Sequence, residues 1–287
     1  MRNFKLYIAR NIYLIFKALP YITAISLLNE IPTDGNSPIK IIGNDYQLYL
    51  AKNSRNKTPA LDIINEVLAH HLLNCWDIVT PEAAIIKISP FDLRKEYSNY
   101  HKPSYYNKPV FGSSWLHDSI DCNALTVSVN KPDYKKFENP NSIFDIALFD
   151  IWIENDDRKP TNNNLLLQTF NGKQKIIPID NAFIFSSLNY KDLNEQYVAF
   201  SDNDSIIRSD LAISLKKYKT SRSTWAKNDK EKFYLCIESS KKEFDEIAAI
   251  IPQKWGFTDV HKQKIISFLF NEKRNKQVFE QYLYLMK

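Results

Sequence analysis

The sequence predicts an α+β fold of two lobes, a small N-lobe that contains β-strands and a larger, mainly helical C-lobe. Three observations predict it. Residues 21–88 combine short apolar runs typical of strands with one helical pattern, whereas helical patterns dominate from about residue 190 onward. Between the lobes, residues 89–109 are rich in Tyr, Lys, Asn, Ser and Pro and show no period, which is typical of a linker. We therefore expect an N-lobe over residues 1–90, a linker over residues 91–110 and a C-lobe over residues 111–287.

The composition is that of an ordinary globular protein that lacks glycine-rich loops. The chain has 287 residues, of which 44% are hydrophobic and 25% charged, so it is long enough to bury a core. It contains five glycines, and the closest two, Gly35 and Gly43, are eight positions apart. This excludes a dinucleotide-binding GxGxxG loop, a Walker A loop and a GxSxG nucleophile elbow, each of which needs closely spaced glycines.

Charge and cysteine content exclude further classes. The net charge of +5 is lower than that of most electrostatic nucleic-acid binders, so we expect no direct nucleic-acid partner. The three cysteines are far apart and no CxxC or HxxxH motif occurs, which argues against a disulfide scaffold and against a zinc site. A reducing, cytoplasmic location fits best.

The first 28 residues are apolar and begin with basic residues, as in a signal sequence. Arg10, Lys17 and Pro20 interrupt them, however, and no small-residue cleavage site follows. We expect an amphipathic helix over residues 3–17 and a strand over residues 21–27. Stable membrane insertion is not expected, and attachment to a membrane surface is the less favoured alternative.

The N-lobe pattern continues with a hairpin and a helix. Two apolar runs, residues 39–42 and 46–52, flank a Gly-Asn-Asp turn, and alternation places Leu50 and Lys52 on one face of the second strand. Residues 61–73 have helical spacing, and a short β-type run follows at residues 83–88. Glu66 lies off the apolar stripe of the helix, so periodicity alone favours a solvated position for it.

The C-lobe begins with a polar loop between a helix and a hairpin. A helix that begins near Ser142 ends in the polar loop 154–164, after which residues 165–168 and 175–179 read as strands joined by an Asn-Gly turn. Asp180 follows the second strand. Amphipathic stretches at residues 238–250 and 259–285 predict the remaining helices.

This loop and hairpin predict a phosphate-binding metal site. Because paired strands lie side by side, the hairpin brings Asp157 and Asn162 of the loop near Asp180. Two carboxylates and a carboxamide oxygen are hard donors that suit Mg²⁺ bound together with a phosphate. Phosphoryl transfer needs such a metal, a carboxylate that accepts the proton of the attacking hydroxyl, and a cation on the phosphates.

The spacing is that of a kinase. Kinase catalytic loops place an asparagine five residues after the catalytic aspartate, as Asn162 follows Asp157, and then a hairpin leads to a metal-binding aspartate. Upstream, Lys52 and Glu66 have the order and spacing of a kinase lysine–glutamate pair, and Leu50 would lie against the nucleotide base. In isolation the polar loop is equally well explained by capping and turn formation. Five elements in the right order favour a nucleotide–metal site in a two-lobed protein-kinase-like fold.

These residues resemble the HipA-like kinases, especially their small stand-alone members, over about residues 18–185. The resemblance is carried by Tyr21–Leu28, the Gly35–Pro38 loop, the strand into Lys52, Asn65–Glu66 and the run Phe149–Phe183, which includes Asn155–Asn162 (NDDRKPTN) and Ile179–Asp180.

The resemblance implies a role for each matching residue. Asp157 would be the catalytic base, Asn162 and Asp180 the Mg²⁺ ligands, Lys52 the phosphate-binding lysine and Glu66 its partner. Gly35 and Ser37 match a loop near the phosphates whose serine is autophosphorylated in some members. Lys159 departs from the family pattern, which has a histidine there, so it would either weaken catalysis or act as a transition-state cation. Because Asp156 lies directly before Asp157, either of these two aspartates could be the catalytic base.

The expected function is ATP- and Mg²⁺-dependent phosphorylation of a protein serine or threonine. The resemblance further implies a toxin of a toxin–antitoxin system, with an antitoxin or other regulatory protein as partner. Two alternatives stay open: a pseudokinase that acts as a binding module, suggested by Lys159, and a lipid or small-molecule kinase, suggested by the basic, aromatic N-terminal helix.

Overall fold

The computed structural model describes residues 18–33, 37–94, 97, 101–122, 129–187, 189–219 and 221–287. The helix expected over residues 3–17 and the glycine Gly35 lie outside these ranges. Within them, the fold is α+β, as the sequence predicts.

Five strands form a closed barrel in the order β1-β2-β3-β5-β4. Neighbouring strands are antiparallel, except that β1 and β4 run parallel. The hairpin of β2 and β3 confirms the predicted strand pair, and at its turn a Cβ atom on Gly43 would lie 2.6 Å from side-chain atoms of Asp45 and Ile22. The strands are β1 (Tyr21–Glu30), β2 (Ile39–Gly43), β3 (Leu48–Lys52), β4 (Ala83–Lys87) and β5 (Val110–Ser114).

Successive side chains of β3 point to opposite faces of the strand, and this decides which of them are buried in the barrel. Tyr49 and Ala51 are buried with the apolar residues inside the barrel, whereas Leu50 and Lys52 are half-buried on the opposite face. The barrel also includes β5, whose residues pair with β3 and β4. Residues 110–114 therefore lie with the β-strands, whereas the sequence predicts that the mainly helical part begins at residue 111. An aperiodic linker gives no signal for a strand that pairs with distant partners.

A second, three-stranded sheet has the order β6-β7-β8. The turn between β7 and β8 is the predicted Asn171–Gly172 pair, and both residues have positive φ, 49° and 71°. Such a two-residue turn matches the twist of the flanking strands, and asparagine and glycine tolerate these angles best. The strands are β6 (Ser119–Asp121), β7 (Leu165–Phe170) and β8 (Lys173–Pro178).

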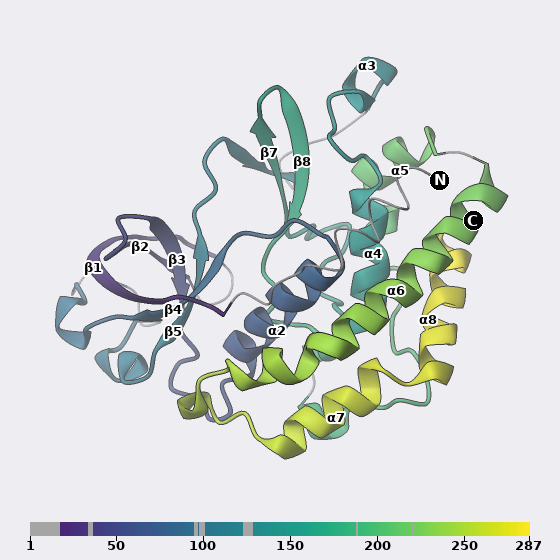
Figure 1. Ribbon diagram of the computed structural model, residues 1–287. Helices are drawn as coiled ribbons and strands as arrows, with labels where there is room; N and C mark the ends of the chain where they lie inside the picture. Colours follow the sequence, from purple (N-terminus) through teal and green to yellow (C-terminus); the bar gives the residue numbers. More distant parts are fainter. Residues whose placement is uncertain are drawn as a thin grey trace.

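Helix α2 lies next to the barrel, the long helices α6 to α8 lie beyond it on the side away from the barrel, and the β7–β8 hairpin is beside α4 (Figure 1). The stretch 259–285 forms two helices, because the side chain of Asn271 caps the second one by accepting a hydrogen bond from the backbone N–H of Arg274. The helices are α2 (Leu61–Cys75), α3 (Lys131–Tyr134), α4 (Ser142–Ile153), α5 (Asp210–Lys216), α6 (Arg222–Ala249), α7 (Asp259–Leu269) and α8 (Glu272–Leu285).

An aromatic cluster fixes α2 to the helical part. The ring of Trp76, directly after α2, lies 5.1 Å from Trp152 and 5.2 Å from Phe149 of α4, and 5.7 Å from Phe233 of α6. Such contacts stabilise beyond the apolar area that they bury. No helix in the described ranges combines the length and the apolar character needed to cross a bilayer.

We expect His71 of α2 to make stability depend on pH. Burial, and secondarily the neighbouring His70, lowers the pKa of His71 to about 3. The unfolded chain takes up this proton near pH 6.5 and the folded chain does not, so stability is lost as the pH falls below 6.5. Between pH 7 and pH 5 the free energy of unfolding should fall by about 2 kcal/mol through this residue.

Urea unfolding of the wild type and of His71→Gln at pH 7 and pH 5 checks this expectation. Burial also lowers the pKa of His101, which contributes in the same direction. The variant should therefore keep part of the pH dependence and lose the part due to His71. An unchanged dependence would show that His71 is not its source.

Candidate functional site

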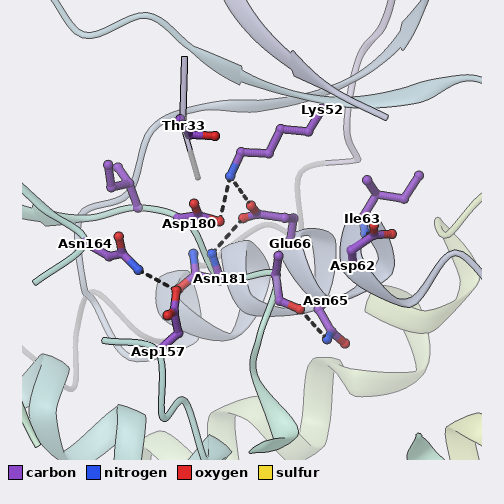
Figure 2. A network of polar contacts seen from close by, with 12 residues as sticks. Thr33, Lys52, Asp62, Ile63, Asn65, Glu66, Asp157, Asn164, Asp180 and Asn181 are labelled. Carbon is purple, nitrogen blue, oxygen red and sulfur yellow. Dashed lines mark hydrogen bonds and ion pairs between the residues drawn. The ribbon is translucent and has the colours of Figure 1, made fainter. Parts of the chain in front are cut away.

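Three charged side chains from distant parts of the chain meet beside the barrel. Lys52 is the last residue of β3, Glu66 lies in the middle of α2, and Asp180 is the second residue after β8. Lys52 Nζ lies 2.5 Å from Glu66 Oε1 and 2.9 Å from Asp180 Oδ1 (Figure 2). Glu66 is 4% and Lys52 14% exposed, whereas Asp180 is 43% exposed. Lys52 is thus paired with the buried carboxylate of Glu66 and with the more accessible carboxylate of Asp180.

The charges of this cluster stabilise one another. Burial would lower the pKa of Lys52, but Asp180 and Glu66 together outweigh it and raise that pKa, so the ammonium group stays protonated. The charge of Lys52 in turn holds the pKa of Asp180 below its usual value. Burial raises the pKa of Glu66, against the opposing effect of Lys52.

The position of Glu66 differs from what periodicity favours. Glu66 is buried together with most of α2, because this helix lies between the barrel, the segment after β8 and helix α6. A helix covered on several sides has no solvated face, so its charged residues must find partners. Glu66 finds them in Lys52 and in the backbone N–H of Asn181, which donates to Oε2 at 3.1 Å.

The loop after α4 holds Asp157 between two asparagines. Asn162 Nδ2 donates to Asp157 Oδ1 at 3.1 Å, and Asn164 Nδ2 donates to Asp157 Oδ2 at 2.9 Å. The backbones of Lys159 and Asn162 exchange hydrogen bonds of 3.0 and 2.9 Å, which close the loop. Both oxygens of the Asp157 carboxylate are therefore oriented by the loop itself.

Arg158 connects this loop to Asp180. Its side chain is fully buried, and it donates to the carboxylate of Asp150, to the carbonyl of Ile179 at 2.9 Å and to Oδ1 of Asn181 at 2.7 Å. Ile179 and Asn181 flank Asp180, so the arginine fixes the backbone on both sides of that carboxylate. Burial raises the pKa of Asp150 to about 7, and Arg158 opposes this shift.

Arg158, Asn164 and Asp150 are functional residues that the sequence patterns do not single out. One signal was present: Asp150 is a lone carboxylate in the apolar run of α4, and such a residue is rarely buried without a cation. Within the described residues no hydrogen bond joins Asn162 to Asp180. The loop is linked to the residues around Asp180 through Arg158 and through the backbone hydrogen bond from the Ile179 N–H to the Asn164 carbonyl.

A cleft of about 400 Å³ opens between the barrel and the β7–β8 hairpin. Lys52, Glu66 and Asp180 lie at its polar end, while Leu50 and Trp115 contribute apolar surface. This combination of an apolar part and a charged end suits a ligand with a planar base and a phosphate chain.

Ser37 lies outside the residues that line this cleft, although Thr33 and Pro38 line it. It is 5% exposed, with φ of 42°, and its carbonyl accepts a hydrogen bond of 2.7 Å from Nε2 of the buried His101. The serine hydroxyl is therefore shielded in this conformation.

A second hollow, of about 310 Å³, lies against the loop. It is lined by Asp156, Asp157, Lys159, Phe183 and Asp204. Burial, and then the charges of Asp204 and Asp157, raises the pKa of Asp156. Asp157 thus stands at this hollow, next to both Asp156 and the lysine that departs from the family pattern.

The donor set fits a Mg²⁺ ion that is bound together with phosphate. Asp180 supplies a carboxylate and Asn162 a carboxamide, both of which are hard oxygen donors. The described ranges contain no cluster of three or more His, Cys, Asp or Glu side chains suited to a metal ion, so ligands from a bound phosphate chain would complete the site.

Comparison with known proteins gives one family and a set of similar solved structures, among them the following two. The family described as HipA-like kinase matches residues 33–281. The crystal structure of CtkA, a proinflammatory kinase of Helicobacter pylori, is similar with a TM-score of 0.55 and 15% identity, covering 93% of this chain and 99% of that chain.

HipA of Shewanella oneidensis MR-1, solved with HipB and operator DNA of its toxin–antitoxin system, matches with a TM-score of 0.29 and 11% identity, over 98% of this chain and 68% of that chain. No match was found among curated proteins. At 15% identity, the likeness to CtkA concerns the fold.

Proposed function

The chain belongs to the HipA-like kinase family, and we propose that it transfers the γ-phosphoryl group of Mg²⁺-bound ATP to a serine or threonine hydroxyl of a protein. The observation that carries this proposal is the Lys52–Glu66–Asp180 cluster at the polar end of the cleft. Phosphoryl transfer requires a cation that binds the phosphates and oxygen ligands that hold a metal ion. Here Lys52 would supply the cation, and Asp180 and the loop residue Asn162 would supply oxygen ligands.

Each residue has a proposed role. Lys52 binds phosphate oxygens, and Glu66 restricts the rotamers of its side chain. Asp180 and Asn162 would hold Mg²⁺, which neutralises charge on the phosphates when it is bound. Leu50 lies against the base.

At the second hollow, Asp157 of the loop after α4 orients the acceptor hydroxyl and accepts its proton as that oxygen attacks phosphorus. Its carboxylate is suited to this task because Asn162 and Asn164 orient both of its oxygens. The hollow beside it would receive the acceptor, and Lys159, which lines the same hollow, would offset transition-state charge.

We further propose the two-lobed kinase-like layout, with the barrel and α2 forming the smaller lobe and the cleft lying between the lobes. Because Ser37 is shielded, its phosphorylation requires Ser37 to leave His101. The role of a toxin restrained by an antitoxin stays a prediction from the family.

Calorimetric titration of ATP with and without Mg²⁺ tests the proposal. Mg²⁺ should tighten ATP binding to the wild type, and Asp180→Ala should lose about tenfold or more of that metal-dependent gain, because its carboxylate is a metal ligand. Asp245→Ala removes an acidic side chain of α6 that is 76% exposed and should behave as the wild type. Equal metal dependence in Asp180→Ala would contradict the ligand role, and absence of ATP binding in the wild type would favour the binding-module alternative.

A further inference from the structure

Two adjacent side chains of α2 contact the segment that follows Asp180. Glu66 accepts a hydrogen bond from the Asn181 N–H at 3.1 Å. Asn65 Nδ2 donates to the Ala182 carbonyl at 2.8 Å and to the Ile184 carbonyl at 3.4 Å. Figure 2 shows the Glu66 side chain beside Asp180, and Asn65 lower on the same helix. The helix thus contacts the backbone of three residues in this segment, Asn181, Ala182 and Ile184.

Asn65 is buried and its amide is fully engaged. The side chain is enclosed, with an exposed fraction of 3%, and Oδ1 accepts a hydrogen bond of 2.6 Å from the Tyr190 hydroxyl. Burial raises the pKa of Tyr190, so this hydroxyl stays a donor. Because both ends of the amide are bound, its orientation is determined, and with it the position of the two carbonyls that it holds.

The backbone at Asp180 needs such support. Its φ is +54°, in the left-handed region that residues other than glycine rarely adopt. Arg158 and Asn164 hold the chain before Asp180 through the Ile179 carbonyl and N–H, and Asn65 and Glu66 hold it after Asp180. A strained residue keeps its conformation only when its surroundings determine it from both sides.

We infer that Asn65 is a positioning residue for the metal site: it holds residues 182–184 so that the Asp180 carboxylate is oriented for Mg²⁺. This inference rests on the proposed function, in which Asp180 is a metal ligand. Groups that orient a metal ligand commonly contribute a 10- to 100-fold factor in metal affinity.

The test compares Asn65→Ala with a buried asparagine elsewhere. Asn275 of α8 is also 3% exposed and donates to a backbone carbonyl, that of Leu269, at 3.0 Å. Asn275→Ala therefore reproduces the loss of a buried amide far from the cleft. Tyr190→Phe removes one hydroxyl and leaves Asn65 in place, which provides a milder variant if Asn65→Ala does not fold.

Two measurements are made on each full-length variant. Calorimetry gives the Mg²⁺ concentration that half-saturates ATP binding, and hydrogen exchange of the metal-free protein gives the protection of residues 181–184. We expect Asn65→Ala to raise the half-saturating Mg²⁺ concentration by about 10- to 100-fold and to speed exchange in this segment. Tyr190→Phe should change both in the same direction by less, and Asn275→Ala should change neither.

The outcomes separate the inference from the proposed function. If Asn65→Ala and Tyr190→Phe speed exchange in residues 181–184 but keep the wild-type Mg²⁺ dependence, Asn65 serves the fold alone and the inference is wrong. If the wild type shows no Mg²⁺-dependent ATP binding, the proposed function fails, whereas faster exchange in Asn65→Ala would still show that Asn65 holds the segment.

Discussion

Replacement of Asp157 by asparagine is expected to lower phosphoryl transfer by about 10²- to 10⁴-fold, the usual contribution of a positioned general base. The variant keeps the size of the side chain and one acceptor oxygen for the amides of Asn162 and Asn164, but it cannot accept a proton. ATP binding should change little, because Asp157 lines the hollow on the acceptor side and the cleft is lined by other residues. Transfer of radiolabelled γ-phosphate to the protein itself and to a mixed peptide acceptor measures the effect.

The neighbouring Asp156→Asn is the matched control. It makes the same chemical change one position earlier, in a residue that lines the same hollow. Asp156→Asn should retain most of the transfer activity. If Asp156→Asn loses the activity and Asp157→Asn keeps it, the base is Asp156, and if both keep it, neither residue is the base.

Replacement of Arg158 by methionine is expected to have the largest effect on stability. The guanidinium is fully buried and pairs with Asp150, which is 2% exposed. Removing one partner leaves a buried carboxylate without its cation, which costs about 3–5 kcal/mol of unfolding free energy. Urea unfolding of the wild type and of Arg158→Met measures the difference.

The double variant Asp150→Leu/Arg158→Met identifies the cause. It removes both charges, so it should recover part of the lost stability. Transfer activity should stay low in both variants, because the carbonyl of Ile179 and the amide of Asn181 still lack their donor. No recovery in the double variant would show that the contacts around Asp180, rather than the lone charge of Asp150, account for the loss.

Local signals in the sequence predicted much of the fold. Hairpins are determined by turn residues a few positions apart, so the Gly43–Asp45 and Asn171–Gly172 turns and their strands could be found. Helices α2 and α4 follow from apolar periodicity, as do the C-terminal part of α6, predicted over residues 238–250, and the stretch 259–285 that contains α7 and α8. The strand β5 could not be found, because its pairing with β3 and β4 depends on partners that lie 24 to 65 positions away.

The residues of the candidate site also fall into two groups: those that the sequence predicts and those that only the tertiary structure shows. Spacing alone singled out Lys52, Glu66, Asp157, Asn162 and Asp180, since the kinase arrangement has a characteristic order along the chain. Only the tertiary structure decided that Glu66 is buried rather than solvated, that Arg158 joins the loop to Asp180, and that Asn65 holds the segment after it. These contacts depend on burial, and burial is set by how helices and strands pack on one another, which no local pattern encodes.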